Sequence, residues 1–413
     1  MKLILTFFLI TIVWGKTIED NIENSFSQVR TGLDILLSEK TELIQGKNIG
    51  LVTNQSGVNQ DSIPNYKLFI ESKNVHLKAI FAPEHGFFGN VSAGKNIENQ
   101  QLNDFPMIYS LYGNTRKPTL EMLDGLDIII YDIQDIGTRF YTYISTLGLV
   151  MEAAAEAGIP VIVLDRPNPL GGLNIEGPIL DLKYSSFVGM YPIPIRYGLT
   201  VGELAKMIVG QKWIKSIPEL YVVRMQYWRR NMTFEKTGLT WIKPSPNIPD
   251  LETAIIYPGM CLLEATNLSE GRGTLQPFKK VGAPWYHDEI TMDMNGMKLN
   301  GVSFKKIYYT PKSIKGMSEN PKFLNQKCVG LKTTVRDQST FNSVETGLKF
   351  LYITQIMSAR NFEVMPERMN KLWGNNQLTL LLKGKGSLIK ILKEMNHDVA
   401  FFREQREPYL LYD

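Results

Sequence analysis

Short apolar runs alternate with amphipathic stretches in the first half of the chain. Four of these runs have the length of a strand and end in polar residues; they cover residues 47–54, 76–85, 126–135 and 160–166. Residues 143–157 instead repeat apolar side chains at helical spacing, and Gly158 stands where a glycine commonly ends a helix. A further unit begins at Thr200, an N-cap residue with Glu203 three positions on, and leads to a strand at residues 220–223. This alternation predicts an α/β fold with a mainly parallel sheet covered on both faces.

The later chain has a different pattern. Residues 231–290 are rich in Pro, Asn and Gly, which is typical of loops, and a long irregular region in a compact protein is often functional. After it come two strand-like runs and two helical stretches, at residues 301–304, 328–333, 342–358 and 386–395. We therefore expect a boundary near residue 275, with a first domain over residues 17–275 and a smaller α+β domain over residues 276–413.

The first residues have the pattern of a secretory signal peptide. One cation, Lys2, precedes an apolar run over residues 3–14, and Gly15 follows it. The run is shorter than the roughly 20 residues that span a bilayer, and no later run is longer. We expect residues 1–16 to be a signal peptide and the mature protein to be secreted or periplasmic. The alternative is an apolar N-terminal arm or an uncleaved anchor.

Composition excludes several classes of protein. The 413 residues carry 45 Lys and Arg against 41 Asp and Glu, a net charge of +4 without any basic tract, so no nucleic-acid partner is expected. Four histidines without HExxH spacing and two cysteines predict no metal site. The glycine-rich fingerprint of dinucleotide binding, the phosphate loop and the GxSxG elbow are all missing, so we expect no cofactor. Pairing of Cys261 with Cys328 stays open.

The ends of the predicted strands are the expected place for a ligand. In open parallel sheets, ligands bind beyond the carboxyl ends of the strands. The polar residues that follow the four strands, and that we select as candidates on this ground, are Asn54, Glu84, His85, Asp132, Gln134, Asp135, Arg139, Arg166 and Asn168. Capping of turns or helices explains some of them, but it explains the charged side chains poorly.

Glu84 is the main candidate for acid–base chemistry. Phe81, Phe87 and Phe88 surround it in sequence, and apolar surroundings raise the pKa of a carboxyl, as a general acid requires near neutral pH. His85 is placed to orient or exchange the proton. The alternative is an ion-paired surface glutamate beside a structural histidine.

Two further carboxylates follow the third strand. Asp132 and Asp135 have an odd spacing, so they point to opposite faces if the strand continues, and we expect only one of them to face the site.

A second polar cluster lies in the irregular region. Glu264, Asn267, Glu270 and Arg272 occur within nine residues of a glycine-containing loop, a composition suited to a polar ligand with an anionic group, because arginine binds carboxylates with two parallel N–H groups. A solvated turn held by an internal Glu–Arg pair is the alternative. Further candidates are Asn247, in the Pro- and Asn-rich loop, and aromatic residues such as Tyr141, which suits stacking on a sugar.

Several ordered blocks together resemble the NamZ-type exo-β-N-acetylmuramidases, secreted glycoside hydrolases of bacterial cell-wall turnover. The blocks are residues 50–57, 81–89, 131–142, 164–172, 176–178, 194–204, 241–249, 257–285 and 409–412. The resemblance implies a Rossmann-like N-terminal domain, a smaller C-terminal domain and an active cleft between them. It also implies removal of terminal β-1,4-linked N-acetylmuramic acid from the non-reducing end of peptidoglycan fragments, with Glu84 as the catalytic acid. Tyr197 departs from the pattern, because many relatives are expected to have histidine there.

Glycoside hydrolysis normally uses two carboxylates, and the second one is open in this sequence. Our hypothesis is that the substrate's own 2-acetamido group attacks the anomeric carbon while Asp132 or Asp135 steadies it. For the lactyl carboxylate of muramic acid we predict Arg139, Arg166 or Arg272 as the partner. The expected partners are muramyl disaccharides or short peptidoglycan chains. The rival interpretations are a non-catalytic cell-wall carbohydrate-binding protein and a metal- or carboxylate-dependent hydrolase of another substrate.

Overall fold

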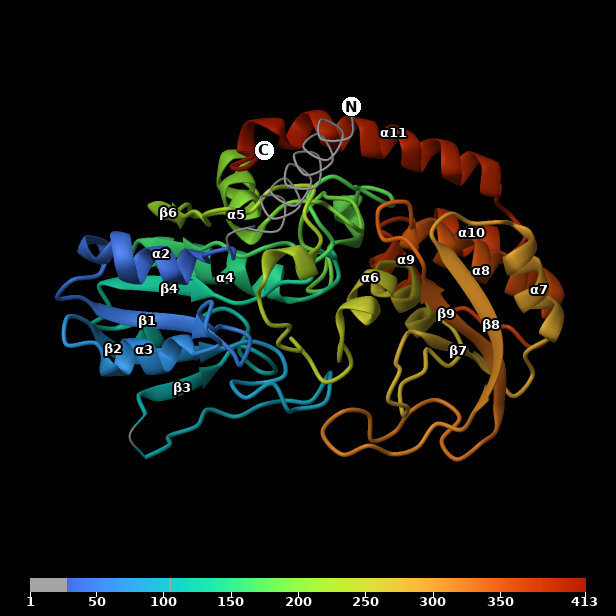
Figure 1. Cartoon of the computed structure of the whole chain (residues 1–413), viewed down its shortest axis with the longest axis horizontal. Helices are drawn as coiled ribbons and strands as arrows, with labels where there is room; N and C mark the ends of the chain where they lie inside the picture. The colour runs from blue at the N-terminus through green and yellow to red at the C-terminus, as the bar shows by residue number, and fades with distance from the viewer. Residues whose placement is uncertain (1–27, 104) are drawn as a thin grey trace, which may run out of the picture.

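The computed structural model describes residues 28–103 and 105–413, in two parts that each contain a sheet (Figure 1). The predicted signal peptide lies outside the described residues. In the first part, six parallel strands have the order β3-β2-β1-β4-β5-β6. Their bounds are Asn48–Thr53 (β1), His76–Ala82 (β2), Met107–Ser110 (β3), Ile128–Asp132 (β4), Val161–Leu164 (β5) and Leu220–Val223 (β6). This sheet and its helices confirm the predicted α/β fold class.

Helices cover both faces of this sheet. α2 (Gly32–Glu39) and α3 (Asn65–Glu71) share one buried cluster with Leu51, Ile130 and other alternate strand residues. α4 (Tyr143–Glu156) and α5 (Val201–Gly210) pack on the other face, in the main core. Every residue of β4 and β5 is buried because both faces of these central strands are covered, which is why residues 128–131 and 161–164 are continuous apolar runs. The predicted capping box at the start of α5 is also present.

The second part combines helices with a three-stranded antiparallel sheet of order β7-β9-β8. Its elements are α6 (Leu251–Met260), β7 (Lys280–Ala283), α7 (Asp288–Gly296), β8 (Val302–Tyr309), β9 (Cys328–Val335), α8 (Ser343–Met357), α9 (Pro366–Trp373), α10 (Gln377–Leu382) and α11 (Leu388–Arg406). α6 packs closely on α8, since Ser343 Oγ donates to the carbonyl of Ile256 and accepts from the amide of Gly259. The domain boundary near residue 275 stays a prediction.

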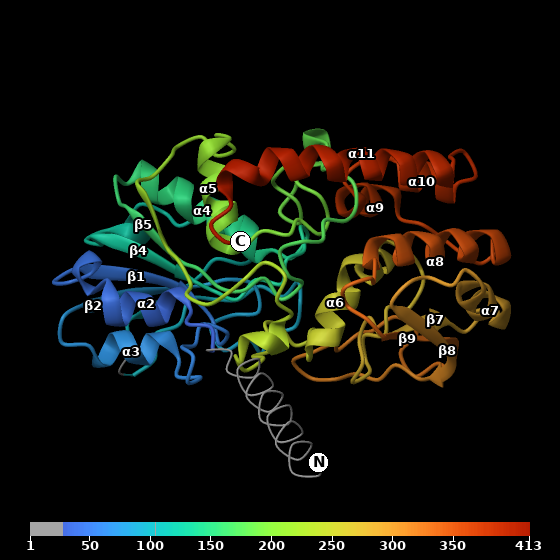
Figure 2. The same ribbon diagram turned by 45° about the horizontal axis from the view of Figure 1, so that its top comes forward.

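The C-terminal helix connects the two parts. α11 runs from the second part back over the first (Figures 1 and 2). The residues after it are tied to the first part, because the Tyr412 hydroxyl donates to Asp165 Oδ2 at 2.6 Å and the Arg230 amide donates to the carbonyl of Asp413. No helix in the described ranges is both long and apolar enough to cross a bilayer.

Candidate active site

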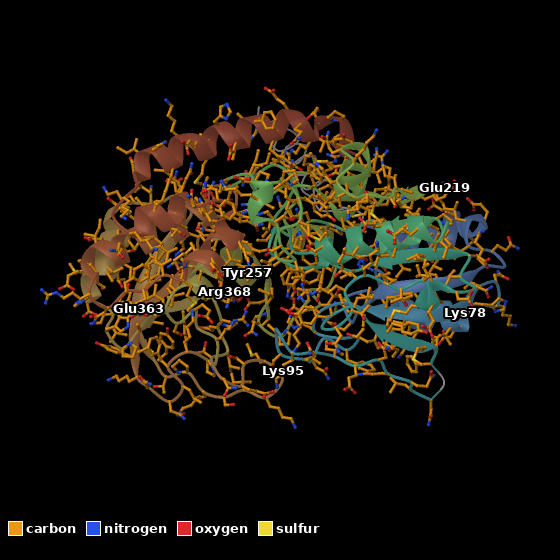
Figure 3. All side chains as sticks on the ribbon, turned by 180° about the vertical axis from the view of Figure 1, so that it is seen from behind. Lys78, Lys95, Glu219, Tyr257, Glu363 and Arg368 are labelled. Carbon is orange, nitrogen blue, oxygen red and sulfur yellow. The ribbon has the colours of Figure 1, made fainter. Side chains whose placement is uncertain are left out.

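A cleft of about 740 Å³ lies between the two parts, within the range usual for small-molecule sites. Its lining includes Tyr257 and Arg368 of the second part and Lys95 of the first, which are labelled in Figure 3. The first part contributes polar residues from the segments after β2 and β3 and from the start of α4, and the second part contributes η5 (Cys261–Ala265), the loops that follow it and α9. The polar and charged lining residues central to the chemistry are Glu84, His85, Tyr112, Arg116, Thr142, Glu264, Glu270, Arg272, Lys322, Arg368 and Lys371.

Glu84 follows β2 and lines this cleft as predicted from the strand ends. Its carboxylate accepts two hydrogen bonds, one from the Thr142 hydroxyl at 2.8 Å and one from the backbone amide of Gly94 at 3.2 Å. Tyr112 lies close enough for burial together with this carboxylate to raise the pKa of its phenol. Hydrogen-bond donors rather than cations therefore hold Glu84 in place.

The aromatic residues near Glu84 differ from those suggested by the sequence. Phe87 packs edge-on against Tyr66 at 5.0 Å between ring centroids, and Phe88 is exposed, so neither lines the cleft. A left-handed turn, with φ of 74° at His85 and 76° at Gly86, separates Glu84 from these two phenylalanines. The aromatic lining comes instead from other segments, at Tyr112, Phe140, Tyr141, Phe187, Tyr257 and Phe278.

His85 is buried and its ring has a defined hydrogen bond. Nδ1 lies 2.8 Å from the carbonyl oxygen of Val91, which only accepts, so Nδ1 carries the proton and Nε2 is left as an acceptor. Burial lowers the pKa of His85, and the neighbouring Glu84 carboxylate only partly opposes this. The ring is therefore neutral at pH 7. Its positive φ in a non-glycine residue is the kind of backbone strain that persists where surrounding structure holds it.

The predicted loop cluster forms the opposite wall. Glu264 binds Arg272 at 2.6 Å and Arg368 at 2.5 Å, while Glu270 lies 3.5 Å from Arg272 and 3.1 Å from Lys322. Burial disfavours the charged form of Glu264, but the two arginines outweigh it and lower its pKa. The internal Glu–Arg pair considered as an alternative is thus present, and it lines the cleft.

Of three other candidates in the loops and near α4, two line the cleft and one does not. Asn267 lies outside the cleft, where it bonds the carbonyl of Asn361 and the amide of Glu363 and so fixes the loop. Asn247 lines the cleft; its Nδ2 donates to the carbonyl of Met317 at 2.8 Å, and its buried Oδ1 has no partner among the described residues. Tyr141 also lines the cleft.

Asp132 and Asp135 do not line the cleft. Asp132 accepts two hydrogen bonds from Arg166, at 2.6 and 2.9 Å, so this predicted arginine is also absent from the cleft. Asp135 accepts from the hydroxyl of Tyr197 and from the amide of Gly137. Burial raises the pKa of Asp135 to about 6, although these hydrogen bonds oppose the shift. The four strand ends therefore do not deliver all their charged groups to one site.

The remaining residues at this edge hold turns. Asn54 bonds Ser56 and the Tyr143 hydroxyl. Gln134 donates to the carbonyls of Asp135 and Pro167, and Asn168 bonds Leu199 and Leu170. None of the three lines the cleft, because the irregular segment 239–246 covers the edge: Gln55 donates to the carbonyl of Lys243 at 2.9 Å, and Tyr143 donates to that of Pro244 at 2.6 Å.

Arg139 joins the two parts of the molecule instead of lining the cleft. Its guanidinium, which is fully buried, donates to the carbonyls of Pro178 and Ile193 in the first part, both at 2.7 Å, and to those of Leu372 and Trp373 in the second, at 2.9 and 2.8 Å. Burial lowers the pKa of this guanidinium, and the charge of Asp398 only partly opposes this shift.

Six of the eleven lining residues named above as central to the chemistry were not selected from the sequence: Tyr112, Arg116, Thr142, Lys322, Arg368 and Lys371. Tyr112 and Arg116 follow β3, a four-residue strand that the apolar pattern did not reveal, and the two α9 residues lie on a helix that was not predicted. Thr142 precedes the α4 helix, which was predicted, so its place at the helix start was the available signal. Among the described residues, no acidic, histidine and cysteine side chains are grouped to hold a metal ion, and both cysteines are free.

Comparison with known proteins agrees over nearly the whole chain. The family models for the N- and C-terminal parts of the exo-β-N-acetylmuramidase NamZ match residues 49–252 and 255–412. The peptidoglycan β-N-acetylmuramidase NamZ of Bacillus subtilis is 41% identical over 389 residues, which cover 93% of this chain and 92% of that protein. Two crystal structures of DUF1343 family proteins from Bacteroides fragilis superpose with TM-scores of 0.85 and 0.73 at 34% and 32% identity, each covering 94% of this chain and 99% of the other.

These matches identify the chain as an enzyme, a glycoside hydrolase. More specifically, the chain belongs to the NamZ exo-β-N-acetylmuramidase family, which confirms the resemblance found in the sequence.

Proposed function

We propose that this protein removes N-acetylmuramic acid from the non-reducing ends of peptidoglycan fragments, with Glu84 as the general acid in the cleft. The observation that carries the proposal is the environment of this carboxyl. Among the described lining residues, Glu264, Glu270 and Glu319 are each paired with a cation, whereas Glu84 has only hydrogen-bond donors and no cation within ion-pair distance. Because no cation among the described residues occupies its carboxylate oxygens, Glu84 is the lining carboxyl that is free to contact the leaving group of a substrate.

In this mechanism Glu84 protonates the glycosidic oxygen as the bond to the anomeric carbon breaks. The substrate's 2-acetamido oxygen attacks that carbon from the opposite face and forms an oxazolinium ring. Water then attacks the same carbon and opens this ring, and the Glu84 carboxylate accepts a proton from that water. The pairing of the other lining carboxylates favours this substrate-assisted route, because each already neutralises a basic side chain. Asp132 and Asp135 are not assigned a step, since neither lines the cleft.

Action on chain ends is supported by two loops that meet across the cleft. The segment between β8 and β9 reaches the segment after β2, where Lys95 Nζ lies 2.6 Å from Glu319 Oε2. Asn247 adds a hydrogen bond to the carbonyl of Met317 in the same loop. A polymer threaded through the cleft would have to separate these contacts, whereas a chain end enters without doing so.

We also propose, from residues 1–16, that the enzyme is exported; N-terminal sequencing of the mature protein tests this.

The experiment is hydrolysis of a chromogenic β-N-acetylmuramide and the matching β-N-acetylglucosaminide. We expect the wild type to prefer the muramide and Glu84→Gln to lower kcat by about 10²- to 10⁴-fold, the usual contribution of general acid catalysis. Glu219→Gln is the matched control, because this exposed side chain lies far from the cleft (Figure 3). Tight binding of muramyl ligands without turnover would favour the rival interpretation, a cell-wall carbohydrate-binding protein.

A further inference from the structure

The cleft has more positive than negative side chains. Its described lining has six cations and four carboxylates, a surplus of two positive charges with His85 neutral; they are Lys95, Arg116, Arg272, Lys322, Arg368 and Lys371 against Glu84, Glu264, Glu270 and Glu319. A surplus of this sign attracts an anionic ligand. The question is which cation is available to bind it directly.

Most of these cations already have a carboxylate partner. Lys95 is paired with Glu319, and the three basic residues Arg272, Lys322 and Arg368 share Glu264 and Glu270. Arg139 and Arg166, predicted earlier as anion ligands, lie outside the cleft. Among the described lining residues, this leaves two cations without a carboxylate in ion-pair distance, Arg116 and Lys371.

Arg116 is the one of the two that lies on the wall of the catalytic acid. Its guanidinium carbon is 4.4 Å from the ring centroid of Phe187 and 6.0 Å from that of Tyr112, and Tyr112 lines the cleft together with Glu84. Stacking on an aromatic face orients the guanidinium but leaves its in-plane N–H groups free for a carboxylate. Lys371 instead lies on α9 in the opposite wall, three residues after Arg368.

The chemistry of the proposed substrate places an anion near Glu84. The lactyl carboxylate of muramic acid is carried by the same sugar ring whose glycosidic oxygen Glu84 protonates, so the anion and the reacting bond are separated by no more than one ring. We infer that Arg116 binds this carboxylate and is the residue that selects muramides over glucosaminides. This inference rests on the proposed function.

The test compares three chromogenic substrates: the β-N-acetylmuramide, its lactyl methyl ester, which has lost the charge, and the β-N-acetylglucosaminide. For Arg116→Ala we expect the ratio of kcat/KM for muramide over glucosaminide to fall about 10- to 100-fold, as expected for loss of a hydrogen bond to a charged group. Arg116→Lys retains the charge without the two parallel N–H groups, so its kcat/KM ratio should lie between those of the wild type and Arg116→Ala. The ester should be a poor substrate for the wild type and lose little further in Arg116→Ala.

Two controls separate the alternatives. Arg229→Ala removes an exposed arginine outside the cleft and should leave the ratio unchanged. The inference would be overturned if Arg116→Ala kept the wild-type preference for the muramide, or if only Lys371→Ala lost that preference. Neither result would affect the proposed muramidase activity. If the wild type hydrolyses no muramide, the proposed function fails; calorimetric binding of N-acetylmuramic acid against N-acetylglucosamine then still decides the role of Arg116. Should Arg116→Ala not fold, Arg116→Gln and the ester series give the same comparison.

Discussion

Replacing Arg139 by methionine distinguishes two roles for this residue: binding of a substrate anion, and holding the two parts of the molecule together. Methionine fills a similar space but donates no hydrogen bond, so four carbonyls, two from each part of the molecule, lose their partner. Each bond from a charged donor contributes about 1.5–3 kcal/mol when its partner stays buried. The guanidinium is itself buried without a close carboxylate, so removing it recovers part of that energy.

The expected net loss is therefore about 3–5 kcal/mol, the range seen when a buried charged network is broken. For a chain of this size this corresponds to a fall in Tm of roughly 4–6 °C. Arg139→Lys keeps one charge with three donors and should lose less. The assay is differential scanning calorimetry together with kcat/KM on the muramide and the glucosaminide.

We expect the Arg139 variants to melt earlier and to keep the wild-type ratio of the two kcat/KM values, because Arg139 does not line the cleft. A variant that melts with the wild type but no longer prefers the muramide would refute this reasoning. It would mean that the guanidinium leaves its four carbonyls to bind the substrate.

Three further predictions concern the site, a buried carboxyl and the thiols. Thr142→Val removes a donor to Glu84 and should lower kcat about 3- to 10-fold without changing Tm; an unchanged kcat would show that this hydrogen bond does not position the acid. Burial raises the pKa of Asp135 from 3.8 to about 6, so its contribution to stability is full below pH 3.8 and is lost as the pH rises through 6. Asp135→Asn should therefore gain roughly 3 kcal/mol over the wild type across that window in denaturant titrations, and a constant difference would count against it. Burial raises the pKa of Cys261 well above its ordinary value and that of Cys328 to about 11, so a thiol reagent should titrate neither in the native protein and both after unfolding; immediate native labelling would contradict the burial.

The fold of the first part was largely predictable because its signals are local. Strands buried on both faces require continuous apolar runs, and β4 and β5 have them. The capping box at the start of α5 is a local signal too, because its two residues, Thr200 and Glu203, lie within four positions of each other. β3 and α9 escaped because four residues and eight residues give too little periodicity to distinguish from a loop.

The sequence by itself determined the family and the α/β fold class, and it made Glu84 the leading candidate for the acid, since each of these depends on residue order. Only the tertiary structure decided which charged groups meet. Arg139, Arg166 and Arg272 were equivalent candidates for binding an anion. In the structure each already has partners: Arg139 binds four carbonyls, Arg166 pairs with Asp132, and Arg272 pairs with two glutamates. Arg116 was passed over because its place follows from a short strand and from Phe187, seventy-one residues away in the chain. Electrostatic availability depends on distances between remote segments, and a sequence pattern does not contain those distances.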